Sequence, residues 1–165
     1  MKNRFLARLS LLAVISALSV LVTNLFPEGI ATGIKGTPYI FFSVTCLGLA
    51  DMMIGSRRYY LSMFGLISGV LAFIIPGGPM VLNILLNFSR AICWEIMRPL
   101  KYIRIIVSET VASIFVILLL KPVMGINMPV IAFIFLFLIP HTIAALIGYK
   151  FSLIIGKRME WEEEK

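Results

Sequence analysis

The chain has 165 residues, of which 60% are hydrophobic and 14% are charged, and its mean hydropathy is +1.01. An ordinary soluble domain lacks the polar surface to cover so much apolar side chain, so the composition predicts a protein solvated by membrane lipids. The net charge of +7 does not indicate nucleic-acid binding, because the basic residues form small clusters between apolar runs rather than one face or arm.

Six apolar segments follow one another along the chain. The first, about residues 5–24, is longer than the core of a signal peptide and lacks a convincing cleavage site, so we expect an uncleaved span. The others cover about 38–55, 59–75, 80–97, 102–120 and 129–156, bounded by prolines, glycines and charges. This pattern predicts one all-α domain over residues 1–165, a compact six-transmembrane-helix bundle.

The basic residues of the connections predict the orientation of the bundle. Ten lie on the side of the two termini and two, Lys35 and Lys121, lie on the other side. The ten are Lys2, Arg4, Arg8, Arg57, Arg58, Arg98, Lys101, Arg104, Lys157 and Arg158. Because positive charge is retained on the cytoplasmic side, we expect a multi-pass protein of the plasma membrane with both termini in the cytoplasm.

The segment 80–97 carries a polar stripe in an otherwise apolar run. Asn83, Asn87, Arg90, Trp94 and Arg98 are spaced 4, 3, 4 and 4 residues apart, which places them on one helical face. With a rise of about 1.5 Å per residue from the outer boundary, Arg90 lies roughly 16 Å deep, near the middle of the membrane. We therefore expect the stripe to face the interior of the bundle, since a lipid-facing guanidinium is unfavourable there.

An acidic partner for Arg90 is available in the next segment. The segments 80–97 and 102–120 are joined by a short turn, so they are antiparallel neighbours in which Arg90 and Glu109 share a level. We predict an Arg90–Glu109 ion pair, which either fixes helix register or contributes to a binding site. Glu95, nearer the cytoplasm, is expected to pair with the basic residues that follow it, Arg98, Lys101 and Arg104.

The last segment places His141 near mid-depth, directly after Pro140. A single histidine is not a metal site, so it is either packed with satisfied hydrogen bonds or in contact with a ligand. Ala145 and Gly148 follow it on one face, which suits close helix packing. Gly65 and Gly69 form a similar small-residue pair in the third segment, and internal packing is the favoured interpretation there.

Catalytic and cofactor motifs are missing from the sequence. Cys46 and Cys93 lie in apolar runs without a CxxC partner, and there is one histidine and no G-x-S-x-G. We therefore expect neither an enzyme nor a metal or cofactor site. No nucleotide-binding loop of the form G-x-x-x-x-G-K is present either.

A family resemblance is carried by both ends of the chain. Residues 7–19 (ARLSLLAVISALS) contain the pair Ala13-xxx-Ala17, a long first outer loop follows, and residues 140–150 read PHTIAALIGYK. With six short spans, this layout resembles the substrate-binding S components of energy-coupling factor (ECF) transporters.

The resemblance implies a membrane receptor that captures a vitamin or related micronutrient from outside. It implies partner docking through Ala13 and Ala17 onto a transmembrane coupling subunit, which two cytoplasmic ATPases drive. It places a small-molecule pocket in the outer half of the bundle, under a lid formed by the first outer loop. Carried over by position, the binding residues are Asn83, Asn87, Arg90, Glu109 and His141, and the lid residues are Glu28, Lys35 and Tyr39.

A second resemblance supports an alternative function. Residues 48–58 (GLADMMIGSRR) are similar to the loop between the second and third helices of major facilitator proteins, with one extra residue after Asp51. A proton-linked secondary transporter acting as a homodimer would use Arg90, Glu109 and His141. Pairing of Asp51 with nearby arginines explains the same residues without transport.

Overall fold

The computed structural model describes residues 14–15, 18, 37–54, 59–74, 80–124 and 129–158. Within these ranges every regular element is a helix and no strand occurs, which confirms the all-α prediction. The long helices are α2 (Thr37–Ile54), α3 (Tyr60–Ile74), α4 (Met80–Ile96), α5 (Lys101–Met124) and α7 (Ile139–Arg158). Short elements join them: η2 (Arg98–Leu100), α6 (Val130–Phe133) and η3 (Ile134–Leu138).

The helix boundaries follow the prolines, with one exception. Helix α4 ends before the 3₁₀ turn η2, in which Pro99 is the second residue, and Lys101 begins α5 with a φ of 22°. The prediction that the fifth segment ends before Pro122 is wrong, because α5 continues to Met124. A proline in the last turn of a helix removes one backbone hydrogen bond, and the chain continues in helical conformation past it.

The last predicted segment is continuous but not uniformly α-helical. Helix α6 leads into η3, a π-helical turn, which leads into α7. The N–H of Ile139 donates to the carbonyl of Ile134, five residues earlier. Such a wide turn is typical where a proline, here Pro140, interrupts the normal ladder of bonds.

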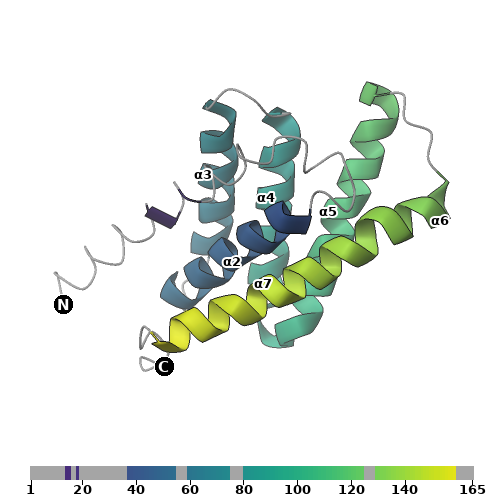
Figure 1. Ribbon diagram of the computed structural model, residues 1–165. Helices are drawn as coiled ribbons and strands as arrows, with labels where there is room; N and C mark the ends of the chain where they lie inside the picture. The colour runs from purple at the N-terminus through teal and green to yellow at the C-terminus, as the bar shows by residue number, and fades with distance from the viewer. Residues whose placement is uncertain are drawn as a thin grey trace.

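The helices form two groups that cross each other. Helix α2 packs along α7, whereas α3 packs on α4 and α4 on α5 (Figure 1). Close contacts occur at glycines: a Cβ added to Gly148 would lie 2.5 Å from the carbonyl oxygen of Phe41, and one added to Gly65 would lie 2.5 Å from the Cβ of Ala91. Both small-residue faces therefore pack inside the fold, as predicted.

The helices combine a hydrophobic core with buried polar groups and with exposed apolar side chains. In α7, the buried residues His141, Ala145, Gly148 and Ser152 repeat at helical spacing. The opposite face exposes a row of apolar side chains: Ile143, Ile147, Phe151 and Ile154. Charged and polar groups are buried on neighbouring helices, among them Arg90, Arg104, Glu109 and Asn87.

One helix in the described part of the chain, Ile131–Arg158, is long and apolar enough to cross a membrane, with a mean hydropathy of 2.3. Shorter apolar stretches cover Thr37–Met53 and Tyr60–Val70. Helices α3 and α4, of 15 and 17 residues, are shorter than the roughly 20 that a span needs. The described structure thus establishes an all-α fold, and the expected six spans remain a prediction.

Candidate functional site

The predicted ion pair between Arg90 and Glu109 is present in the interior. The Nε of Arg90 donates to Oε1 of Glu109 at 2.7 Å, and Nη2 donates to Oε2 at 2.9 Å. The side chains are 2% and 1% exposed. This two-point geometry is the strongest arrangement of the two groups, and it joins α4 to α5 at the level that the short connection predicts.

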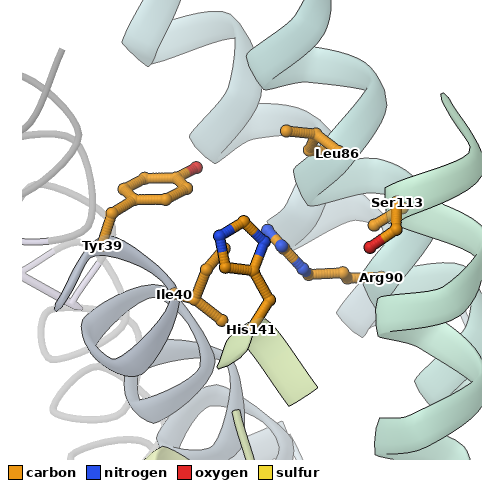
Figure 2. Close-up of a pocket in the computed structure, with 7 residues that line it drawn as sticks. Tyr39, Ile40, Leu86, Arg90, Ser113 and His141 are labelled. Carbon is orange, nitrogen blue, oxygen red and sulfur yellow. The ribbon is translucent and has the colours of Figure 1, made fainter. Parts of the chain in front are cut away.

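A small cavity lies against the opposite edge of the Arg90 guanidinium. Its wall contains residues of four helices: Tyr39 and Ile40 from α2, Leu86 and Arg90 from α4, Ala112 and Ser113 from α5, and His141 from α7. In Figure 2 the guanidinium of Arg90 extends between these helices toward the ring of His141. The cavity measures about 10 Å³, which is at the lower limit of the space that one water molecule needs.

Two hydrogen-bond donors of this wall lack a regular hydrogen-bond partner among the described residues. They are the hydroxyl of Tyr39 and the Nη1 of Arg90, and both residues are almost completely buried. The hydroxyl lies beside the Arg90 guanidinium and interacts with it both electrostatically and as a weak hydrogen-bond partner, although the two groups do not meet regular hydrogen-bond geometry. Because buried donors are rarely left unpaired, their position marks this cavity as a candidate binding site.

A second cavity of about 10 Å³ lies on another side of Arg90. Its polar wall includes Ser43, whose hydroxyl donates to Oδ1 of Asn87 at 3.2 Å, and Ser68, whose hydroxyl has no partner among the described residues. Arg90 therefore contributes to the walls of both small cavities.

The predicted binding residues are only partly brought together. Arg90 and His141 line the first cavity, Asn87 lines the second, and Glu109 lies behind Arg90 as its ion-pair partner. Asn83 belongs to α4, but its side chain lies outside the described part. The predictions on the lid residues Glu28 and Lys35 and on the docking residues Ala13 and Ala17 also fall outside it.

Tyr39 differs from its predicted place in the lid. It lies in the first turn of α2, fully buried, and forms part of the cavity wall. The helix begins at Thr37, close to the predicted start at about residue 38, so Tyr39 belongs to the helix that follows the loop and not to the loop itself. Ser113 was missed; its spacing of four residues from Glu109 places both on one face and was the available signal.

The predicted pairing of Glu95 with the basic residues after it is wrong. Its Oε2 accepts a hydrogen bond from the backbone N–H of Ser62 at 3.0 Å and a second one from the Ser62 hydroxyl. Ser62 lies in the first turn of α3, where backbone N–H groups have no partner within the helix. Glu95 thus caps the N-terminus of the neighbouring helix, where negative charge is favoured.

The basic residues instead pair with Asp51 of α2. Arg98 donates to Oδ1 of Asp51 at 3.0 Å, and Arg104 approaches Oδ2 at 2.8 Å. Arg104 also lies 4.7 Å from the centre of the Trp94 ring and donates to the hydroxyl of Tyr149 at 3.2 Å. This Asp51 cluster (Asp51, Arg98 and Arg104) connects α2, η2, α5 and α7.

Within the described residues, no group of three or more His, Cys, Asp or Glu side chains could hold a metal ion. Comparisons with protein-family models, curated proteins and solved structures return no match for this chain.

Proposed function

We propose that the chain is the membrane-embedded substrate-capture subunit of an ECF-type importer for a vitamin or related micronutrient. In this proposal six helices span the plasma membrane, both termini lie in the cytoplasm, and the cavity beside Arg90 forms the floor of the substrate site. The first helix docks through Ala13 and Ala17 on a coupling subunit that two ATPases drive.

One observation supports the proposal most directly. Tyr39, Arg90, Ser113 and His141 come from four different helices and meet at one cavity, while the outward faces of α2, α3, α5 and α7 expose apolar side chains. Buried polar groups inside an apolar bundle are costly unless they bind something or one another, and in membrane proteins they mark substrate pathways. A membrane-embedded binding subunit explains both the polar groups at the cavity and the apolar side chains on the outward faces.

The size of the cavity sets a condition on the proposal. A space of about 10 Å³ admits no vitamin, so substrate binding requires α2 and α7 to separate from α4 and α5. At this level the Ser43 hydroxyl of α2 donates a hydrogen bond to Asn87 of α4, which would have to break. Opening the site would leave the Arg90–Glu109 pair intact, because both of its members lie in the α4–α5 group.

Native mass spectrometry of the gently released full chain tests this function. We expect a bound small molecule, and co-purification of a coupling subunit with two ATPases from the native membrane. Ala13→Trp should abolish that complex by filling the small face of the first helix, whereas Val14→Trp, at an exposed neighbouring position, should not. Absence of any bound molecule, together with a complex that tolerates Ala13→Trp, would overturn the proposal.

A proton-linked transporter is the second candidate, favoured by the buried Arg90–Glu109 pair and by His141 in the adjacent cavity. The Asp51 motif supports it less, because Asp51 is engaged by Arg98 and Arg104. Proton-driven uptake by the purified chain alone in vesicles would establish this candidate. A strict requirement for ATPases would exclude it.

A further inference from the structure

The cavity beside Arg90 has a chemical preference that follows from its charges and donors. Its wall contains a single group with a permanent charge, the guanidinium of Arg90. That charge is already matched by Glu109, which binds Nε and Nη2 at 2.7 and 2.9 Å and does not line the cavity. The site is therefore electrically neutral while it still presents donors.

An anion would be a poor occupant of this space. It would add a second negative charge close to the Glu109 carboxylate, in an interior where water cannot screen it. A cation would be repelled by Arg90 and would find no carboxylate in the wall. Both charged classes are thus disfavoured by the same ion pair.

An uncharged acceptor satisfies the groups that are present. The Nη1 of Arg90 can only donate, and the hydroxyl of Tyr39 can donate. The two groups interact weakly with each other, and neither makes a regular hydrogen bond to a described residue. Both side chains are more than nine-tenths buried, and both line the cavity with Ser113 and His141. One carbonyl oxygen has two lone pairs and accepts from both donors at once.

We infer that this cavity recognises the carbonyl-type oxygen of an uncharged ligand, such as an amide or lactam, and discriminates against carboxylates. The inference rests on the proposed function, since it names the substrate class of the same site. It gives the Arg90–Glu109 pair a chemical role beyond helix register: Glu109 removes the anion affinity that a lone arginine would have.

Formamide and formate test this preference, because they are nearly the same size and differ in charge. Saturation-transfer NMR on the formyl proton of each probe is measured with the full chain in detergent at pH 8, where formate is ionised. We expect transfer to formamide and none to formate. Stronger transfer to formate, or transfer to neither probe, overturns the inference.

Two variants tie the signal to this cavity. Tyr39→Phe keeps the ion pair and removes one donor, so the formamide signal should fall several-fold. Glu109→Gln leaves Arg90 uncompensated, so this variant should gain transfer to formate; if it does not fold, the Tyr39→Phe result decides alone. Ser62→Ala is the matched control, because it removes a hydroxyl remote from this cavity wall, and a formamide loss equal to that of Tyr39→Phe would contradict the assignment.

The identity of a co-purified molecule separates this inference from the function itself. If native mass spectrometry finds a bound carboxylate, the capture function stands and the preference for an uncharged ligand is wrong. If the chain carries no small molecule and forms no complex, the capture function is wrong regardless of how the two probes behave.

Discussion

The Arg90–Glu109 pair and the Asp51 cluster use the same chemistry in two different ways. The first has one arginine and one carboxylate, both buried, and leaves an arginine nitrogen without a partner beside a cavity. The second has two arginines for one carboxylate, and its members Asp51 and Arg98 are 12% and 28% exposed. Burial and the ratio of charges thus distinguish a candidate binding site from a helix connection.

Aromatic rings explain how the Asp51 cluster tolerates its extra positive charge. Arg104 is buried, yet its guanidinium lies over Trp94 and 5.4 Å from the ring centre of Tyr149. Ring faces attract cations, so they supplement the shared carboxylate. Arg90 is instead paired with the carboxylate of Glu109.

The largest effect on stability is expected when the side chain of Arg90 is removed. Arg90→Ala should lower the free energy of unfolding by about 3–5 kcal/mol, because Glu109 is left buried without a counter-charge. Adding Glu109→Ala should restore part of this loss, as measured by denaturant titration in mixed micelles. Losses that simply add in the double variant would show that the two residues are not coupled.

A smaller effect is expected at the Asp51 cluster. Asp51→Asn should cost about 2 kcal/mol, because two charge-assisted contacts become weaker while the amide oxygen still accepts a hydrogen bond. Raising the salt concentration to about 1 M should shrink this loss, since the cluster is partly exposed. The loss in Arg90→Ala should not respond to salt; equal salt dependence would remove the contrast between the regions.

The third prediction concerns the cap that Glu95 of α4 forms on α3, which is a contact between two helices and not an ion pair. Glu95→Gln should lower the free energy of unfolding by about 1 kcal/mol, the usual contribution of a helix cap. Ser62→Ala should have a smaller effect, because the backbone N–H of Ser62 keeps its bond to Glu95. If Glu95→Gln and Arg98→Gln proved strongly coupled, the basic residues rather than α3 would be the partner of Glu95.

The smallest effect is expected for Arg98. Its side chain is 28% exposed and shares Asp51 with the better buried Arg104. Arg98→Gln should therefore change the free energy of unfolding by about 0.5 kcal/mol, in the range of exposed ion pairs. The thermal unfolding of Arg98→Gln is measured together with that of Arg104→Gln. The second variant should be clearly less stable and provides the internal comparison.

The sequence predicted contacts well where the chain itself fixes the geometry. Helices α4 and α5 are joined by four residues, 97–100, so counting residues from that turn was enough to pair Arg90 with Glu109. The polar stripe of α4 was also correct for Asn87, Arg90 and Trp94, which are all buried. In a strongly amphipathic helix, the sequence alone indicates which face turns inward.

Contacts between helices distant in the chain were not predictable in the same way. Helices α2 and α7 show little separation of polar and apolar residues between their faces, so hydrophobic periodicity is a weak guide to which face each one turns inward. The wall position of Tyr39 and the cap on Ser62 depend on helix rotation and tilt, which packing decides. Charge alone suggested basic partners for Glu95, whereas unpaired backbone N–H groups of α3 provided the closer one.

The π-helical turn η3 divides the last helix into two parts, and the residues that face inward in one part are out of phase with those of the other. Each α-helical residue advances by about 100°, so one extra residue in the turn shifts everything after Leu138 by about that angle. This phase shift brings His141, Gly148 and Ser152 inward together. Deleting one residue between Ile134 and Leu138 would turn His141, Gly148 and Ser152 toward the side where Ile143 and Ile147 now lie. The number of residues in η3 therefore determines whether His141 reaches the cavity.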